Sequence, residues 1–289
     1  MCQLKKNGGK QVSVFIPRVL VGRIVDLLKS MPSFEEIPVT NKYEALRGRI
    51  GDKTVIIYIS GSILYDETLE EFRRMLEEVL YEKYKDQGIV VGSDEAGKGE
   101  ALGPIVVAAT ALSPKQAAYL QSIGVADSKI VPKKKIGELA SEIKRVSLGY
   151  SILMISPKRF NDMFRKGGEN LNDILERGQS QVLKRVVSKI REKPYRIIVD
   201  KFDSSKSGVR MKKISELLGF KVEAIERGEV FPAVAAASIL ARNSYLRWIH
   251  RNVSKELFKE IIRKNYDAVG KEEVPYLFKI RYLEKVRKT

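Results

Sequence analysis

The residues Val90-Val91-Gly92-Ser93-Asp94-Glu95-Ala96-Gly97-Lys98-Gly99-Glu100 are the most informative part of this 289-residue chain. They begin with an apolar, β-branched run that predicts a buried strand over Gly88–Ser93. Two adjacent carboxylates, Asp94 and Glu95, end this strand and are followed by a Gly-Lys-Gly bend. Glycines let a ligand approach the backbone closely, and a lysine with free N–H groups suits a phosphate or a sugar hydroxyl. The alternative is an ordinary polar turn.

A second apolar strand ends on a carboxylate at Tyr195–Asp200. Neighbouring strand ends of an α/β sheet lie at one edge, where ligands bind. We therefore expect Asp200 to lie near Asp94 and Glu95. Taken alone, Asp200 is equally well explained as a solvated residue at the end of a strand.

Two further segments carry polar residues beside apolar ones. Asp127-Ser128-Lys129 places an aspartate at a helix approach, where it acts as a cap, and a lysine that suits a phosphate. Pro232–Tyr245 predicts a helix whose first turns consist almost wholly of small residues, so that it can pack very close to a sheet. Ser238 and Arg242 are four residues apart and share one face of this helix. A tightly packed core helix is the alternative interpretation, and the two are compatible.

Composition excludes several kinds of chemistry. The chain has one cysteine, Cys2, and one histidine, His250, so an internal disulfide, a cysteine zinc site and histidine-based mechanisms lack the residues they need. We interpret His250 as structural. Clustered carboxylates without histidine instead suit Mg²⁺ or Mn²⁺, which prefer oxygen ligands. Two such ions about 4 Å apart can activate a water and stabilise the leaving oxygen of a phosphodiester.

The charge is large and unevenly distributed. The formal net charge is +17. Residues 1–87 hold 14 Lys and Arg against 13 Asp and Glu, so the remaining 39 basic and 23 acidic residues give 88–289 a net charge of +16. This balance indicates a polyanionic partner such as nucleic acid; a solvated lysine- and glutamate-rich surface is the alternative. The residues alone favour a metal-dependent phosphodiester enzyme and leave its substrate open.

The chain divides into two predicted domains. Residues 1–87 show the order strand, helix, several strands, helix, which predicts a small α+β domain whose last helix, Glu67–Tyr84, is capped by Asp66. From residue 88 onward strands alternate with helices, which predicts an α/β domain with a helical C-terminal tail over 88–289. No apolar stretch is long enough to span a membrane, and the start of the chain lacks the apolar centre of a signal peptide. We therefore expect a cytoplasmic protein.

The ordered motifs resemble those of type 2 ribonucleases H. The resemblance covers about residues 88–245 and rests on Gly92–Gly99 with Gly103-Pro104, Asp127-Ser128-Lys129, Ile198-Val199-Asp200 and Ala233–Arg242. The N-terminal part resembles, by its order of elements, the domain similar to the TATA-box-binding protein that marks ribonuclease HIII. The resemblance implies a mixed ribonuclease H-like sheet flanked by helices. It also implies endonucleolytic hydrolysis of the RNA strand of RNA/DNA hybrids with two metal ions, leaving 5′-phosphate and 3′-hydroxyl ends.

The same resemblance implies roles for individual residues. Asp94, Glu95 and Asp200 match the positions of metal ligands. The backbone of Gly97-Lys98-Gly99 would contact ribose 2′-hydroxyls, which distinguish RNA from DNA. The residues expected to contact the sugar-phosphate backbone are Lys129, Ser238 and Arg242.

The fourth catalytic acid departs from the family pattern. The family places it four residues before the position matching Pro232, which is Gly228 here. Glu229 lies one residue later and Glu226 two residues earlier. We favour Glu229, because a loop absorbs a shift of one residue, and Glu226 remains the alternative.

The N-terminal domain is expected to grip the hybrid. Its candidate basic residues are Lys42, Arg47, Arg49 and Lys53, with exposed strand residues that have no partner as the alternative. We expect a monomer that does not bind membranes. Two other functions remain open: a non-catalytic nucleic-acid-binding protein that kept the fold, and a nuclease of the same fold that acts on DNA alone.

Overall fold

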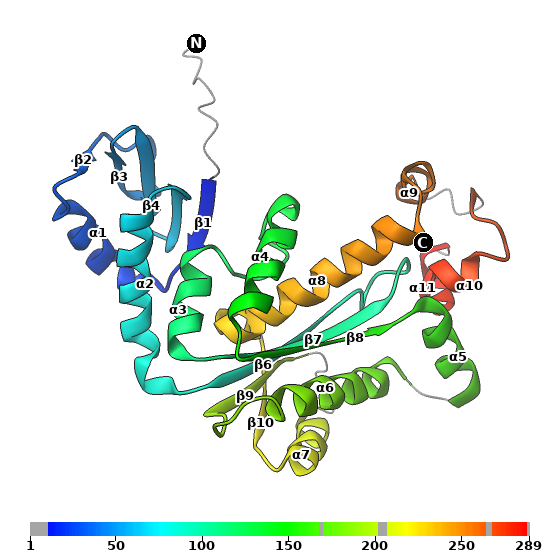
Figure 1. Ribbon diagram of the computed structural model, residues 1–289. Coiled ribbons are helices and arrows are strands. Elements are labelled where there is room, and N and C mark those ends of the chain that lie inside the picture. The colour runs from blue at the N-terminus through cyan, green and yellow to red at the C-terminus, as the bar shows by residue number, and fades with distance from the viewer. Residues whose placement is uncertain (1–10, 168–169, 202–206, 264–267, 288–289) are drawn as a thin grey trace. The chain divides into compact units, whose positions relative to one another are not determined.

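The computed structural model describes residues 11–167, 170–201, 207–263 and 268–287, and Cys2 lies outside them. The chain forms two compact units (Figure 1). The first comprises the residues up to Gln87 together with Pro114–Ala126, and the second comprises Gly88–Ser113 and the residues from Asp127 onward. The helix α3 (Pro114–Ser122), expected in the second domain, packs with the first unit instead.

The first unit contains an antiparallel five-stranded sheet in the order β1-β5-β4-β3-β2. Its strands are β1 (Gln11–Phe15), β2 (Phe34–Glu36), β3 (Glu44–Ile50), β4 (Lys53–Tyr58) and β5 (Ser62–Asp66). Alternate residues are buried, as the period of two requires: Val12 and Val14 on β1, and Val55 and Ile57 on β4. The short strand β2 was not predicted from the sequence.

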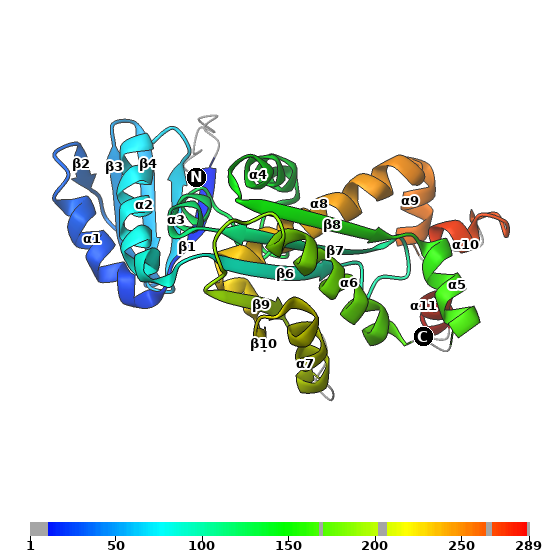
Figure 2. The same ribbon diagram turned by 60° about the horizontal axis from the view of Figure 1, so that its bottom comes forward.

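Helices complete the first unit: η1 (Arg18–Leu20), α1 (Val21–Lys29), α2 (Glu70–Tyr84) and η2 (Lys85–Gln87). The predicted cap of α2 is wrong. The helix begins at Glu70, and the Asp66 carboxylate at the end of β5 accepts hydrogen bonds from Thr68 instead. The later helix α3 lies beside α2 (Figure 2). It is held there because the Tyr65 hydroxyl donates to the Ser122 carbonyl at 2.7 Å.

The second unit contains a mixed five-stranded sheet in the order β10-β9-β6-β7-β8. Its strands are β6 (Val90–Ala96), β7 (Ile105–Leu112), β8 (Gly149–Ile155), β9 (Arg196–Asp200) and β10 (Val222–Ile225). The strands β6, β7 and β8 pair antiparallel, whereas β9 runs parallel to both β6 and β10. The predicted mixed α/β fold is therefore confirmed, and all eight residues of β7, which lies between β6 and β8, are buried.

Helices cover both faces of this sheet. The long helix α8 crosses one face and packs on β6 and β7, and α6 lies on the other (Figures 1 and 2). The helices of the second unit are α4 (Lys133–Val146), α5 (Pro157–Gly167), α6 (Leu171–Val187), α7 (Ser207–Leu218), η3 (Gly228–Val230), α8 (Pro232–Asn252), α9 (Lys255–Ile262), α10 (Val274–Leu277) and α11 (Ile280–Arg287). The predicted helix over Pro232–Tyr245 thus continues for two more turns.

The small residues of α8 have a direct structural cause. A Cβ atom added at Gly92 of β6 would lie 2.3 Å from the backbone of Ala233 and Val234. The helix and the strand therefore approach each other to backbone contact, which only small side chains permit. This close packing places the first turns of α8 directly beside the strand that carries Asp94 and Glu95. In the described part of the chain no helix is long and apolar enough to cross a membrane.

Candidate active site

The parallel pairing of β6 with β9 brings two predicted acids together. The register pairs Gly92 with Ile198 and Ser93 with Val199. One residue further along both strands stand Asp94 and Asp200, at the same edge of the sheet. The structure thus places Asp200 beside Asp94, as expected from the two strand ends.

The side chains of Asp94 and Glu95 point to opposite faces of the sheet. Asp94 follows Gly92 with a spacing of two, so it points toward α8, where it is hydrogen-bonded to the Ser238 side chain. Glu95 points toward α6, where the Gln179 amide nitrogen lies 3.4 Å from its carboxylate. Both acids are largely withdrawn from water, with Asp94 5% exposed and the Glu95 side chain 8% exposed.

Burial and the charges of neighbouring carboxylates raise the pKa values of all three predicted metal ligands. Burial, followed by the charges of Glu95 and Asp200, raises the pKa of Asp94 well above its ordinary value. Burial is also the main cause that raises the pKa of Glu95 to about 7, against the opposing effect of Lys98. The pKa of Asp200 is raised as well, mainly by burial. Clustered buried carboxylates are costly unless a cation neutralises them.

The loop after β10 supplies the fourth predicted acid, Glu229. Its charge acts on Lys129: burial lowers the pKa of Lys129, but the charges of Asp127, Glu229 and Asp94 outweigh this effect and raise that pKa overall. The Glu229 carboxylate lies 3.4 Å from Lys129 Nζ, and its side chain is 12% exposed. Glu226 instead pairs with Lys201 at 2.6 Å, and its side chain is 77% exposed. The structure therefore brings Glu229, rather than Glu226, toward the other acids.

The Asp127-Ser128-Lys129 segment contacts the site through the side chains of Ser128 and Lys129. Asp127 Oδ1 accepts a hydrogen bond from the Lys129 N–H at 3.0 Å, so the aspartate caps its own turn. The Ser238 hydroxyl donates to the Ser128 hydroxyl at 2.8 Å, which ties α8 to this turn. Lys129 remains 77% exposed and available to a phosphate.

The glycine bend follows β6 directly. Gly97 and Gly103 have φ values of +82° and +80°, which L side chains rarely adopt. A Cβ atom at Gly97 would also lie 2.1 Å from the Pro104 carbonyl oxygen, whereas one at Gly99 would meet nothing within 4 Å. Lys98 Nζ lies 3.5 Å from the Glu95 carboxylate. The bend is therefore fixed at Gly97 and open to a ligand at Gly99.

Arg242 is engaged within the protein. Its guanidinium pairs with the Glu100 carboxylate at 2.6 Å, and its side chain is 26% exposed. The hydroxyl of Tyr245, one turn further along α8, contacts the same carboxylate and lies 2.9 Å from the Leu102 carbonyl oxygen. Arg242 thus holds the end of the glycine bend, and a phosphate would have to compete with Glu100 for it.

Gln179 and Glu100 take part in this arrangement without having been singled out in the sequence. Gln179 is completely buried on α6, contacts the Ser93 hydroxyl and reaches Glu95. A polar residue on the apolar face of an amphipathic helix is the signal that could have identified it. No local sequence signal identifies the role of Glu100, because its partners lie more than 140 positions away.

The acids are suited to a cation by their chemistry but are not closed around one. In residues 11–167, 170–201, 207–263 and 268–287, no group of three or more His, Cys, Asp or Glu side chains is arranged so that it could hold a metal ion as it stands. Glu95 turns toward Lys98 and Gln179, and Asp94 turns toward Ser238. The set offers only carboxylate oxygens, which hard divalent ions prefer.

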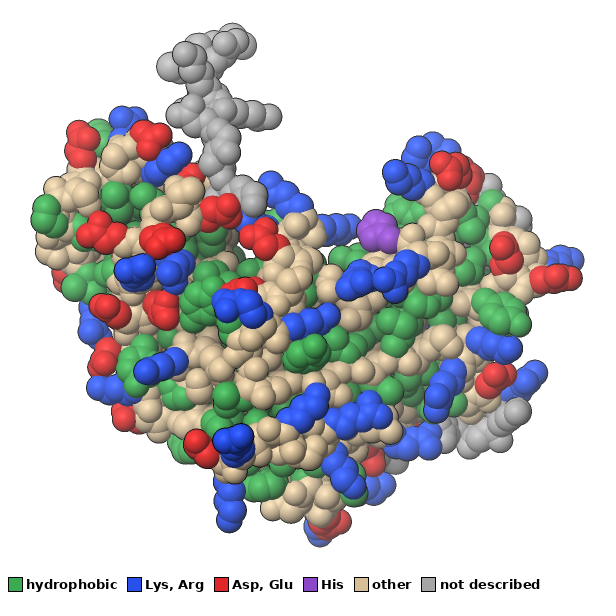
Figure 3. All heavy atoms as spheres, viewed as in Figure 1, with side chains coloured by type: hydrophobic (Ala, Val, Ile, Leu, Met, Phe, Trp, Pro, Cys, Tyr) green, Lys and Arg blue, Asp and Glu red, His purple; other side chains and the backbone are tan. Residues whose placement is uncertain are grey.

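Basic side chains gather on the second unit. Figure 3 shows Lys and Arg side chains along α8 and over α6. The basic residues of these two helices are Arg177, Lys184, Arg185, Arg242, Arg247 and Arg251. A positively charged surface suits a polyanionic partner.

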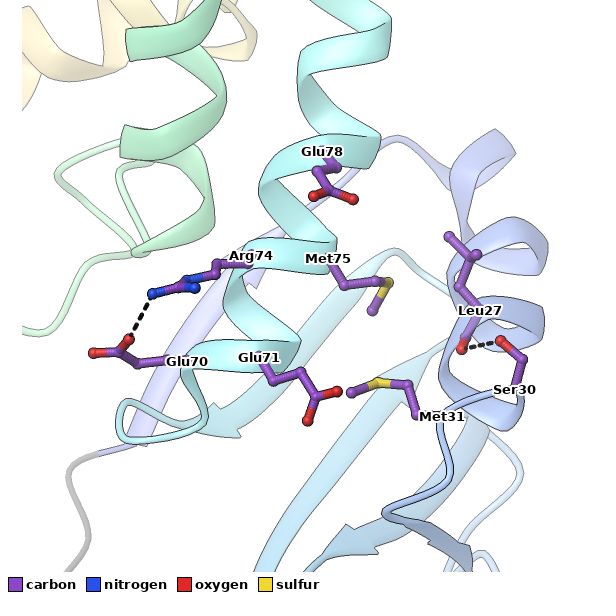
Figure 4. Close-up of a pocket in the computed structure, with 8 residues that line it drawn as sticks. All are labelled: Leu27, Ser30, Met31, Glu70, Glu71, Arg74, Met75 and Glu78. Carbon is purple, nitrogen blue, oxygen red and sulfur yellow. Dashed lines mark hydrogen bonds and ion pairs between the residues drawn. The ribbon is translucent and has the colours of Figure 1, made fainter.

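A hollow between α1 and α2 lies in the first unit, and its lining is partly apolar and partly acidic (Figure 4). Leu27, Met31 and Met75 form its apolar part. One serine, three glutamates and one arginine line the rest: Ser30, Glu70, Glu71, Glu78 and Arg74. Arg74 is paired with Glu70, so the charge of this rim is net negative and unsuited to a phosphate backbone.

The fold and the site define a member of the ribonuclease HII family, and the chain belongs to this family. The family model, described as Ribonuclease HII, matches residues 91–268, which is more than half of the chain and includes all four predicted acids. The resemblance to type 2 ribonucleases H found in the motifs is therefore confirmed.

Among these enzymes the chain is similar to ribonucleases HIII. It is 34% identical over 170 residues to the Ribonuclease HIII of Protochlamydia amoebophila (strain UWE25), an alignment that covers 58% of this chain and 54% of that protein. It is 30% identical over 207 residues to the Ribonuclease HIII of Bacillus mycoides (strain KBAB4), covering 67% and 65%. The chain thus spans about half to two thirds of the length of these two relatives.

A solved structure extends the likeness of fold to both units. The crystal structure of Bst-RNase HIII in complex with Mn²⁺ superposes with a TM-score of 0.59 and 19% identity, covering 96% of this chain and 98% of that one. The N-terminal unit is included in this similarity. Its likeness to the TATA-box-binding protein stays a prediction from the order of its elements.

Proposed function

We propose that this protein is an endonuclease that hydrolyses the RNA strand of RNA/DNA hybrids. The observation that carries the proposal is the register of β6 and β9, which brings Asp94 and Asp200 to one edge of the sheet beside Glu95. Their raised pKa values reflect charges that repel one another in a buried place. Membership of the ribonuclease HII family and similarity to ribonucleases HIII support the same activity.

We propose Mg²⁺ or Mn²⁺ as the cofactor, with two ions bound during the reaction. Asp94, Glu95 and Asp200 would hold them, with Asp94 placed between the other two. When bound, the ions would activate a water and stabilise the leaving oxygen of the phosphodiester. The Mn²⁺ in the Bst-RNase HIII structure supports a divalent cation. Glu95 and Asp94 would have to turn toward the ions from their present partners, which a cation favours because it removes their repulsion.

The remaining residues would position the substrate. The open backbone at Gly99, together with Gly97 and Lys98, would contact ribose 2′-hydroxyls. Exposed Lys129 would contact a phosphate, while Ser238 would act mainly by orienting Asp94 and the Ser128 turn. Cleavage would leave 5′-phosphate and 3′-hydroxyl ends.

The N-terminal unit would grip the hybrid through the sheet face that its helices leave uncovered. Among the four basic candidates, Arg47 is held by two hydrogen bonds to Glu44 and Lys53 lies near Asp52 and Asp66. Lys42 lies over the ring of Tyr43. Arg49 is exposed on β3 and is the candidate best placed to meet a phosphate. We propose that the protein works as a monomer.

The test is a metal-titrated digestion of an end-labelled RNA/DNA hybrid beside a DNA duplex of matched sequence. The wild-type protein is expected to cut only the RNA strand, and only with Mg²⁺ or Mn²⁺. Asp94→Asn should lose at least about 10³-fold in kcat while retaining hybrid binding, since the charge that holds the ions is removed. Cutting of the DNA duplex would establish a DNA nuclease instead. Hybrid binding by the wild type without cleavage would establish a non-catalytic binding protein.

A further inference from the structure

Lys279 is a charged residue with no exposed surface at all. It lies between α10 and α11, more than 175 positions after the glycine bend in sequence. Its Nζ donates a hydrogen bond to the Gly103 carbonyl oxygen at 2.5 Å, and its backbone N–H donates to the Ala101 carbonyl oxygen at 2.8 Å. Both ends of this residue therefore hold the same short loop, which connects Gly97–Gly99 to β7.

The neighbours of Lys279 hold this loop as well. The Gly103 N–H donates to the Leu277 carbonyl oxygen at 2.8 Å, and Leu102 forms an antiparallel bridge with Phe278. We call Leu277–Ile280 the strap. From the other side Asn161 of α5 fixes the strap, because its amide donates to the Phe278 carbonyl at 2.8 Å and accepts from the Ile280 N–H at 3.0 Å. The loop is thus joined to α5 through the strap.

The cost of burial argues that the side-chain nitrogen of Lys279 has a purpose. Burying a polar or charged nitrogen is costly unless it is hydrogen-bonded, and an apolar side chain of similar size would fill the space at lower cost. Burial lowers the pKa of Lys279 to about 7, against the attraction of Glu100. A loop with two glycines at positive φ is otherwise costly in entropy to hold in one conformation.

We propose that Lys279 is a positioning residue that holds the Gly97–Gly103 loop in the conformation that contacts ribose. This inference rests on the proposed function, because the loop is expected to read 2′-hydroxyls. Lys279 acts through the loop backbone: its side-chain nitrogen holds the Gly103 carbonyl, and Tyr245 packs against both Gly97 and Gly103. A displaced loop would have the same residues, but its backbone would no longer be placed to contact the sugar.

The test is a cycle that combines Lys279→Met with removal of single 2′-hydroxyls from the substrate. Hybrids of one sequence carry a 2′-deoxynucleotide at each position around the main cleavage site in turn, and kcat/KM is measured at saturating Mn²⁺. In the wild type, loss of the contacted hydroxyl should lower kcat/KM strongly. In K279M this penalty should shrink about tenfold or more, because a displacement near 1 Å is enough to lose such a contact.

The control is Lys189→Met. Lys189 Nζ donates to the Tyr150 carbonyl oxygen at 2.8 Å, so this variant also removes a bond from a lysine to a carbonyl in the second unit. It should leave the hydroxyl penalty unchanged. An equal loss of kcat/KM on all substrates in K279M, with the wild-type penalty intact, would show a merely structural role and overturn the proposal. So would the same shrinkage in K189M.

Hydrogen–deuterium exchange separates this proposal from the proposed function. Amides of residues 98–103 should exchange at least about tenfold faster in K279M than in the wild type, while β6 and β7 stay protected. Unchanged exchange of these amides would overturn the proposal that Lys279 holds the loop, whether or not the protein cuts hybrids. If the wild type cuts no hybrid, the proposed function fails, and the exchange measurement alone tests whether Lys279 holds the loop. Should K279M not fold, Asn161→Ala loosens the strap without altering the ammonium group, and it is expected to shift both measurements in the same direction.

Discussion

The backbone N–H of Gly228 donates a hydrogen bond to Asp200 Oδ1 at 2.9 Å. A Cβ atom added at Gly228 would lie 3.3 Å from the same Oδ1 and 3.4 Å from Val234. The position at which the family pattern places its fourth acid is therefore next to Asp200, where this chain has only backbone. The acid that follows, Glu229, interacts with both Asp200 and Lys129.

Glu229→Gln is expected to reduce hybrid cleavage by about 10- to 100-fold, because it removes one charge that acts on the metal-binding acids. Glu226→Gln is the matched control and should stay within about twofold of wild type, since its carboxylate pairs with Lys201 in solvent. Steady-state kinetics at several Mn²⁺ concentrations measure both variants. A larger loss in E226Q than in E229Q would reverse the assignment of the fourth acid.

Gly99→Ala tests whether a ligand approaches the glycine bend. A Cβ there meets nothing within 4 Å and the φ value is not positive, so the melting temperature should change little. We nevertheless expect at least about a tenfold rise in KM for the hybrid, because the methyl group would occupy the space of the sugar.

Gly97→Ala is the contrasting variant. Its Cβ would meet the Pro104 carbonyl oxygen at 2.1 Å at a φ of +82°, so both stability and activity should fall. Thermal unfolding and cleavage measured together distinguish the two effects. Normal KM values in a well-folded G99A protein would mean that no sugar lies against the bend.

The main features of the site were predictable because they depend on local pattern. Strand ends that carry Asp94, Glu95 and Asp200 can be identified from apolar runs, and the shared edge follows from the α/β class. The contacts of Lys279 and Gln179 were not predictable, since both depend on which distant segments the fold brings together. The grouping of α3 with the first unit is of the same kind, as it rests on bonds such as that from Tyr65 to Ser122.

Arg49→Ala tests the grip of the N-terminal unit. Because Arg49 is exposed on the sheet, its loss should weaken hybrid binding and reduce the slope of log Kd against log salt by about one phosphate contact. Arg23→Ala on helix α1 removes an exposed charge from the helical layer and should leave the slope unchanged. Fluorescence anisotropy with the inactive Asp94→Asn background measures Kd from low to moderate salt. Equal slopes in the Asp94→Asn protein and in its Arg49→Ala and Arg23→Ala derivatives would show that Arg49 does not contact the hybrid.

The raised pKa of Glu95 predicts how stability depends on pH. Its folded value of about 7 lies above its ordinary 4.5, so the metal-free folded protein binds the proton more tightly than the unfolded chain. The resulting stabilisation is fully present below about pH 4.5 and is lost as pH rises through 7. Asp94, with its pKa also raised, acts in the same direction. In EDTA, the melting temperature of Glu95→Gln relative to wild type should therefore increase as pH rises from 5 to 8.

Divalent cations should reverse this preference, because they compete with the proton for the same carboxylates. With saturating Mn²⁺ at pH 8 the wild type should melt at a higher temperature than Glu95→Gln. The Mn²⁺ concentration that gives half-maximal cleavage should rise as pH falls from 8 to 6. Glu226→Gln again serves as the control, since its carboxylate is solvated and distant from this competition. A wild-type melting temperature that Mn²⁺ leaves unchanged at pH 8 would show that these acids do not share an ion, and the raised pKa of Glu95 would then be only a cost of burial.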